Sequence, residues 1–149
     1  PDLAGVIARK NAPCCLMHNR KEPDYTDFIA DFLKDMQETI DIAKKAGIAD
    51  ENIILDPGVG FGKTYENNLE IINKLECMHT LGYPILLGTS RKSMIGLTLD
   101  LPVEEREEGT MVTTVYGVQK GCAFVRVHDI KENKRAILMT EAILGRNIK

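Results

Sequence analysis

The sequence of 149 residues contains no tryptophan and only 5% aromatic residues, so we expect a largely aliphatic core. It also lacks an excess of one charge, since 19 basic and 22 acidic side chains give a net charge of -3. The basic residues are scattered rather than clustered, which gives no indication of a nucleic-acid partner. No apolar run approaches the roughly 18 residues of a membrane span, so we expect no membrane partner either.

Cysteine is sparse, and its pattern indicates neither a metal site nor disulfides. Cys14, Cys15, Cys77 and Cys122 form no C-x-x-C pair, and a chain of this length can build a core without disulfides. We interpret all four as free thiols that behave as small apolar side chains, which favours a cytoplasmic protein. The first residues also lack an initiating methionine and a signal-peptide pattern, so we expect the chain to be part of a longer one.

The sequence does contain a regular alternation of short apolar segments and amphipathic ones. It predicts strands at 13–17, 53–56, 84–88 and 123–127, and helices at 2–10, 25–46, 65–78, 103–120 and 130–144. In the helix at 65–78, we expect Leu69, Ile72 and Leu75 to face inward. Four βα units amount to half of a (β/α)₈ barrel, which takes roughly 250 residues when complete. We therefore predict an α/β fold in which residues 1–149 form half of a TIM barrel, with a doubly wound parallel sheet as the alternative.

The most informative segment runs from Asp56 to Thr64, where an apolar strand ends in a carboxylate followed by a glycine-rich turn. Ligands of parallel α/β folds bind at such strand ends. A phosphate-binding P-loop would need glycine six residues before the lysine, where this sequence has Pro57. The dinucleotide fingerprint fails too, because its third glycine arrives one residue early, at Gly62. We expect the glycines to let the backbone approach a ligand held by Asp56; the alternative is a tight turn in which Asp56 caps the next helix.

Two further strands end in polar residues. Ser90-Arg91-Lys92-Ser93 places cations and hydroxyls at a predicted helix start, which suits a carboxylate or a phosphate; an exposed basic turn is the alternative. Arg126 and His128 lie two residues apart on an extended segment, so they share one face and can grip a pyrophosphate together. We expect Asp129 to cap the last helix. The sequence assigns no role to His18, at the end of the first predicted strand.

In combination, these segments resemble the dihydropteroate synthases, folate-pathway enzymes of the pterin-binding barrel superfamily. The resemblance covers essentially the whole chain as the C-terminal half of that family's barrel. It implies condensation of 6-hydroxymethyl-7,8-dihydropterin pyrophosphate with p-aminobenzoate to give dihydropteroate and pyrophosphate. The matching segments are 16–18, 55–64, 88–93, 101–110 and 126–129.

The resemblance also implies roles for individual residues. Asp56 would accept hydrogen bonds from the guanidine-like edge of the pterin, and Lys92 would contact the pterin ring. Arg126 and His128 would hold the leaving pyrophosphate, so these two and Lys92 are the implied catalytic residues. Ser93 would receive the benzoate carboxylate. The full set of implied substrate-binding residues is Met17, Asp56, Gly60, Phe61, Gly88, Lys92, Ser93, Arg126 and His128.

The cofactor implied by the resemblance is Mg²⁺, whose protein ligand in the family lies upstream of this chain, so no residue here is assigned to a metal. The resemblance further implies a sulfonamide target. Because a half barrel leaves sheet edges near Pro13 and Val127, we expect a homodimer or larger assembly. We expect the isolated chain to be poorly active or inactive. Two alternatives remain: a pterin-dependent methyltransferase domain of the same superfamily, and a pterin-binding module without catalysis.

Overall fold

The computed structural model describes residues 2–146, and its four short strands lie parallel to one another. β1 pairs with β2 so that Met17 lies opposite Asp56, and β3 pairs with β4 so that Leu87 lies opposite Val125. A bridge between Leu55 and Ile85 joins the two pairs. The strands therefore follow chain order, and all four end at the same edge. Their bounds are β1 (Cys14–Met17), β2 (Ile53–Asp56), β3 (Leu86–Leu87) and β4 (Phe124–Val125).

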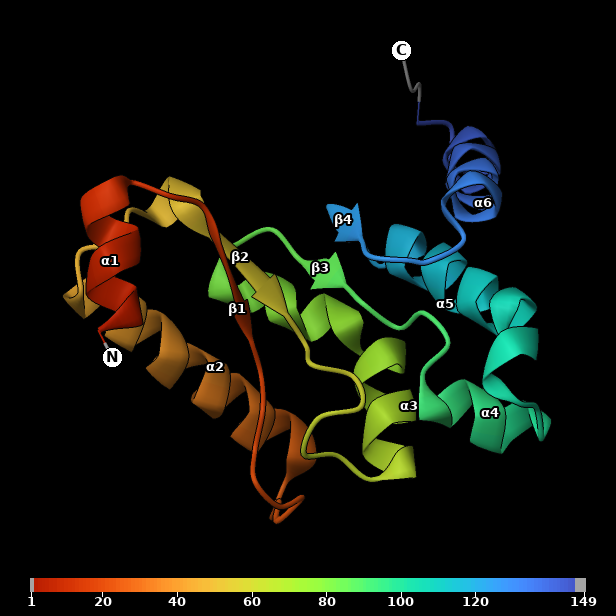
Figure 1. Cartoon of the computed structure of the whole chain (residues 1–149), viewed down its shortest axis with the longest axis horizontal. Helices are drawn as coiled ribbons and strands as arrows, with labels where there is room; N and C mark the ends of the chain where they lie inside the picture. The colour runs from red at the N-terminus through yellow and green to blue at the C-terminus, as the bar shows by residue number, and fades with distance from the viewer. Residues whose placement is uncertain (1, 147–149) are drawn as a thin grey trace.

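The helices lie outside the strands. In Figure 1, four of them, from α2 through α3 and α5 to α6, follow one another round the strands in chain order. Such a succession confirms the predicted α/β class with parallel strands, and residues 2–146 show no reversal of strand order of the kind found in a doubly wound sheet. The helices are α1 (Leu3–Lys10), α2 (Phe28–Lys45), α3 (Tyr65–Asn73), α4 (Ser93–Leu99), α5 (Glu107–Gln119) and α6 (Ile130–Ile143), with 3₁₀ turns at Asp50–Asn52, Leu75–Leu81 and Val103–Glu105.

The core lies between the helices and one face of the strands. α2 buries an apolar stripe with helical spacing that includes Phe32, Met36 and Ile40, as its sequence predicts. This stripe belongs to the same buried cluster as Ile53 and Leu55 of β2, which point to one face because side chains alternate along a strand. Burial of these large side chains fixes the strand ends, where the polar residues lie.

The opposite face of the strands carries the neighbours of these core residues. Cys15 is exposed and Phe124 is 47% exposed, so this inner face is not covered by the described part of the chain. The same alternation places Met17, Asp56 and Arg126 at the carboxyl ends of the inner face. The inner face is thus apolar along the strands and becomes polar at their carboxyl ends.

Two predicted helices are shorter than their apolar patterns suggest. The segment predicted at 65–78 is α-helical only to Asn73 and continues as a 3₁₀ turn. Within it Leu69 is 39% exposed, so the prediction that Leu69 faces inward is wrong; Ile71 is fully buried instead. Leu69 lies on the side of α3 that faces α4 and α5.

The helix predicted at 103–120 is interrupted at Arg106, between a 3₁₀ turn and α5. The Arg106 guanidinium donates to the carbonyl oxygens of Leu101 and Arg91, each at 3.1 Å. These bonds tie Arg106 to the two loops that flank α4, at the position where the backbone departs from helical geometry with φ -100° and ψ 16°. The strands predicted at 84–88 and 123–127 are also shorter, with two paired residues each.

None of the helices in residues 2–146 combines the length and the apolar character that crossing a membrane requires.

Candidate active site

Asp56 lies at the floor of the polar strand ends and is only 1% exposed. Its Oδ1 accepts the backbone N–H of Gly58 at 2.8 Å, which orients the carboxylate. Burial raises the pKa of Asp56, while the Gly58 N–H and the nearby Arg126, Lys92 and Lys63 cations act in the opposite direction. Thr64, not Asp56, caps α3, so the alternative of a capping aspartate is wrong. The backbone thus fixes Oδ1 of this buried carboxylate, while Oδ2 has only a long contact, at 3.4 Å, with Arg126.

The glycine-rich segment after Asp56 passes very close to the end of β1. Gly58 has a φ of +65°, and a Cβ on it would collide with the carbonyl oxygen of His18. Gly62 has a φ of +54° and would collide with the backbone of Arg20 in the same way. Only glycine combines this conformation with this approach. The glycines therefore pack two loops together, which the sequence pattern alone did not reveal.

Arg126 reaches over Asp56 from β4. Its Nη2 lies 3.4 Å from Asp56 Oδ2, and its side chain is 61% exposed. Beside it a cavity of about 160 Å³ opens between the ends of β3 and β4, lined by residues that include Gly88, Lys92 and His128. A guanidinium, an ammonium and an imidazole around one small cavity are suited to an anion.

Lys92 connects the anion cavity to the glycine-rich segment. Its Nζ lies 4.2 Å from the centre of the Phe61 ring, a cation–π geometry that also places Lys92 beside Gly60. Burial lowers the pKa of Lys92, and the Asp56 carboxylate opposes that shift. Lys92 thus contacts the Phe61 ring, and its charge also opposes the burial that raises the pKa of the Asp56 carboxylate.

His128 is held by the neighbouring loop. Ser90 Oγ lies 2.7 Å from His128 Nδ1 and accepts the backbone N–H of His128 at 3.1 Å. This contact occupies Nδ1 of the imidazole and leaves the Nε2 of His128 for a ligand. Arg91 forms a two-pronged ion pair with Asp129 at 2.7 and 3.2 Å between the same loops. Asp129 makes no capping bond to α6, so that prediction is wrong: its carboxylate is turned to Arg91.

Most of the residues predicted for the site come together. Asp56, Lys92 and Arg126 face one another, and Met17 lies opposite Asp56 on β1. Ser93 is exposed at the first residue of α4. Gly88, Lys92, Arg126 and His128 line the cavity at the ends of β3 and β4. Lys92 joins them to Phe61 and Gly60, and Arg126 joins them to Asp56.

A set of buried side chains behind the glycine-rich segment has no role predicted from the sequence. His18 is 2% exposed and lies 3.0 Å from Asp35 and 2.8 Å from the Nζ of Lys63. Asn68, on α3, is also buried and accepts the backbone N–H of Gly60 at 2.7 Å. The sequence places His18 and Asn68 at positions that are otherwise apolar, which indicates two buried polar groups. It does not indicate which residues form hydrogen bonds with them.

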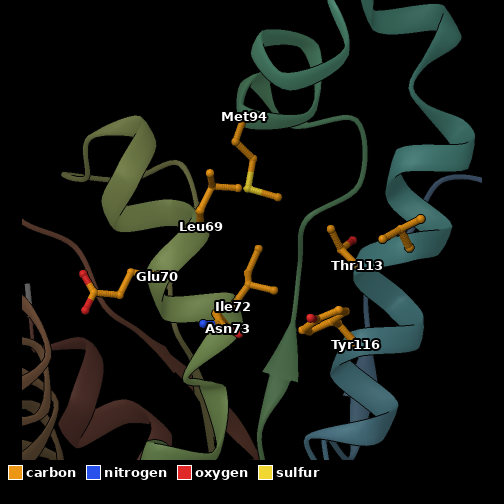
Figure 2. A pocket seen from close by; sticks show the side chains of 8 residues that line it. Leu69, Glu70, Ile72, Asn73, Met94, Thr113 and Tyr116 are labelled. Carbon is orange, nitrogen blue, oxygen red and sulfur yellow. The ribbon is translucent and has the colours of Figure 1, made fainter.

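The structure also contains a larger apolar hollow away from the polar strand ends. It has a volume of about 500 Å³ and lies between α3, α4 and α5. Figure 2 shows Leu69 and Ile72 from α3 on one side of it, Thr113 and Tyr116 from α5 on the other, and Met94 at one end. The hollow lies on the helix side of the strands and faces none of the charged groups of the site, so we do not assign the chemistry to it.

Within residues 2–146, no group of three or more histidine, cysteine, aspartate or glutamate side chains is arranged to hold a metal ion. Asp56 is the one carboxylate at the floor of the site, and Arg126 and Lys92 lie beside it. The donors present here do not fit a Mg²⁺ site of their own.

The family described as pterin binding enzyme matches residues 1–128. The chain belongs to that family.

Individual relatives agree with this assignment. The dihydropteroate synthase of Clostridium beijerinckii is 64% identical over 146 residues, which cover 97% of this chain and 54% of that protein. A crystal structure of the Clostridium difficile dihydropteroate synthase, in the presence of pteroic acid, has a TM-score of 0.93 and 45% identity over 95% of this chain and 54% of its own. The structure of the Xanthomonas albilineans dihydropteroate synthase with 4-aminobenzoic acid has a TM-score of 0.92 and 33% sequence identity. The match covers 97% of this chain and 54% of that one. The chain spans about half the length of these pterin-binding relatives.

Proposed function

We propose that the chain is the C-terminal half of a dihydropteroate synthase and that its four βα units form half of a (β/α)₈ barrel. Parallel strands in chain order, with helices following outside them, are the arrangement that such a barrel repeats eight times. The observation that carries the functional proposal is the buried carboxylate of Asp56, which faces Arg126 and Lys92 at the carboxyl ends of these strands. The relatives' names support the same proposal, and so do the pteroic acid and the 4-aminobenzoic acid named with two of their structures.

Binding of the pterin would use the fixed carboxylate. Asp56 keeps Oδ2 for the N–H groups of the pterin's guanidine-like edge, since Oδ1 is taken by Gly58. Lys92 would contact the ring, and Phe61 and Met17 would form apolar walls. Two charge-assisted hydrogen bonds to a desolvated carboxylate would supply orientation as well as affinity.

The reaction breaks the bond between the pterin methylene carbon and the pyrophosphate oxygen, and it forms a bond from that carbon to the amine nitrogen of p-aminobenzoate. The departing oxygen carries the electron pair, and the amine loses a proton. Stabilising the leaving anion is therefore the main task, which suits Arg126 and His128 beside the anion cavity. No enzyme nucleophile is needed, because the amine itself attacks. Ser93 would receive the benzoate carboxylate.

Mg²⁺ is part of this proposal as a partner of the pyrophosphate, whose charge it would neutralise. The donors within residues 2–146 do not fit a metal site of their own, so no step is assigned to the metal through this chain's residues. Its protein ligand would lie upstream. The cytoplasm is the proposed compartment, which is consistent with four free thiols.

We also propose that the uncovered inner face and the outer edges of β1 and β4 are covered in solution, by the other barrel half or by a second copy of this chain. Exposed strand edges readily pair with other chains. Light scattering of the isolated chain tests the second possibility: a dimer or larger assembly supports it, and a monodisperse monomer contradicts it.

The functional test is formation of dihydropteroate from pterin pyrophosphate, p-aminobenzoate and Mg²⁺, with the chain alone and with the upstream half supplied in trans. We expect product in the second case and its loss in Lys92→Ala, whereas Lys74→Ala, an exposed lysine paired with Glu70, should leave the rate unchanged. Binding of pteroic acid without product in either case would favour a non-catalytic pterin module. Binding of methyl-tetrahydrofolate without product would favour the methyltransferase alternative.

A further inference from the structure

Lys63 points back beneath the glycine-rich segment instead of into solvent. Its Nζ lies 2.8 Å from His18 Nδ1 and 3.0 Å from each of the carbonyl oxygens of Gly58 and Phe61. An ammonium group has three N–H donors, and these are three acceptors. Lys63 is therefore fully used inside the protein, and no role in substrate binding accounts for it.

The contact with Lys63 fixes the protonation of His18. Since Nδ1 accepts from Lys63, the ring hydrogen lies on Nε2 and is donated to Asp35 Oδ2 at 3.0 Å. Arg20 completes the chain through two bonds to the same carboxylate, at 2.6 and 3.0 Å. The result is a directed series from Arg20 through Asp35 and His18 to Lys63, in which every donor meets an acceptor.

Other side chains hold the rest of the segment from Gly58 to Gly62. Tyr25 donates its hydroxyl to the carbonyl oxygen of Gly62 at 2.6 Å, and Asn68 accepts from the N–H of Gly60. The N–H of Gly58 binds Asp56, as described above. The carbonyl oxygen that Lys63 holds thus belongs to the same residue, Gly58, whose N–H orients the carboxylate.

We propose that Lys63, oriented by His18, is a positioning residue that fixes the segment from Gly58 to Gly62 and thereby aligns Asp56 and Phe61 for the pterin. The proposal rests on the proposed function, because it takes Asp56 and Phe61 as the groups that meet the ligand. Lys63 itself acts through the backbone of Gly58 and Phe61. A series of charged hydrogen bonds in a buried setting holds geometry more firmly than single neutral bonds do.

The charges around Lys63 support the proposal. Burial is the largest cause that lowers the pKa of Lys63 to about 8; Lys92 acts in the same direction, while Asp56 and Asp35 oppose it. A deprotonated amine has only two N–H donors, so one of the three bonds must be lost above that pH. Burial also lowers the pKa of His18 to about 4, helped by Lys63 and Arg20 and opposed by Asp35, so His18 remains a neutral acceptor over the working range.

Two measurements on one set of variants test whether Lys63 positions the segment from Gly58 to Gly62. Amide hydrogen exchange at Phe61, whose N–H binds the carbonyl oxygen of Gly58, reports the segment without any ligand. Affinity for pteroic acid between pH 6.5 and 9.5 reports its effect on the site. The variants are Lys63→Met, His18→Asn and His18→Gln, with Lys74→Met as a matched loss of one exposed charge. Asparagine places an oxygen near the Nδ1 position and can still accept from Lys63, whereas glutamine reaches only the Nε2 position.

We expect Lys63→Met to weaken pteroic acid binding by about tenfold or more and to speed exchange at Phe61. His18→Gln should resemble it, and His18→Asn should lie closer to the wild type. Wild-type affinity should fall as the pH rises through about 8, and that fall should vanish in Lys63→Met. Lys74→Met should match the wild type in both readouts.

Unchanged exchange in Lys63→Met, or faster exchange with unchanged affinity, would overturn the proposal. So would equal effects of the two His18 variants, because a merely structural histidine would not distinguish them. If the wild type did not bind pteroic acid even with the upstream half supplied in trans, the proposed function would fail, and exchange at Phe61 would still decide whether Lys63 and His18 hold the segment. If Lys63→Met fails to fold, the comparison of His18→Asn with His18→Gln still tests the proposal, because both variants retain Lys63.

Discussion

The two sides of the site differ in how firmly the protein holds them. On the β2 side, Lys63, Asn68 and Tyr25 bind the backbone of residues 58–62, and Asp56 beneath them is almost fully buried. On the β3–β4 side, the Arg126 side chain is 61% exposed and its contact with Asp56 is a long one, at 3.4 Å. The first side is held by several hydrogen bonds, while the second presents an exposed cation at an open cavity.

This difference fits the two tasks of the proposed reaction. A flat heterocycle is recognised by the direction of its hydrogen bonds, so its carboxylate partner must be rigid. A pyrophosphate that arrives, leaves and carries most of the charge is better served by long side chains that can follow it. The firmly held β2 side and the open β3–β4 side thus lie next to each other at neighbouring strand ends.

The largest change should come from the support of the rigid side. Phe32 is fully buried, and its ring centre lies 4.7 Å from that of His18. Phe32→Ala should lower the free energy of unfolding by about 3–5 kcal/mol because it leaves a cavity under the network. Chemical denaturation measures this. Phe124→Ala, on the exposed inner face, should cost only about 1 kcal/mol; equal losses would refute the contrast between the two sides.

The second largest effect should be a loss of folding stability at acidic pH, through His18 on the rigid side. The folded pKa of His18, about 4, is below its ordinary value of 6.5, so the unfolded chain binds the proton first as pH falls. Stability from this residue is therefore present near pH 7 and is lost between about pH 6.5 and 4, by about 3 kcal/mol in total. Denaturation at several pH values measures the slope. His18→Asn should flatten it, and the exposed control His79→Gln should not.

Removing the charge of the rigid carboxylate should separate binding from stability. Asp56→Asn should weaken pteroic acid binding about 100-fold, because two charge-assisted hydrogen bonds are lost. Its folded pKa is raised, so the ionised form opposes folding at neutral pH, and the variant should be at least as stable as the wild type. Calorimetry and thermal unfolding test both statements. A variant that lost binding and stability together would assign Asp56 to the core; Asp41→Asn is the exposed control.

The smallest change should come from the open side. Ser90→Ala removes the hydroxyl that orients the imidazole of His128, while the cations around the cavity remain. We expect pyrophosphate affinity to fall only about threefold to tenfold, and pteroic acid affinity to be unchanged. Titration calorimetry with each ligand tests this. A loss of pteroic acid binding would mean that the two sides are not independent; Thr80→Ala is the matched hydroxyl control.

Much of the fold could be predicted from the sequence because its signals are local. The strand at 53–56 and the buried stripe of α2 follow from periods of two and 3.6 residues, and both are confirmed. The polar strand ends at Asp56, Lys92 and Arg126 could be anticipated as one site, since parallel strands end at the same edge. Their roles in binding remain predictions.

The outcome differed where contacts between distant residues override a local pattern. Arg106 interrupts the helix predicted at 103–120, and its guanidinium binds the carbonyl oxygens of Leu101 and Arg91. Asp129 has the position of a helix cap, yet Arg91, 38 residues away, takes its carboxylate. In both cases a charged side chain bonds to a residue that the local pattern does not indicate.

By itself, the sequence determined the alternation of strands and helices, the apolar face of α2 and the chemistry available at each strand end, because these depend on residue type and spacing. Only the tertiary structure decided which polar groups meet. Lys63 and His18 are 45 residues apart, and His18 and Asp35 are 17 apart, so no repeat of two or 3.6 residues encodes their contact. The parallel strands bring those loops together, and burial then makes each unpaired donor costly enough that the whole series must be satisfied.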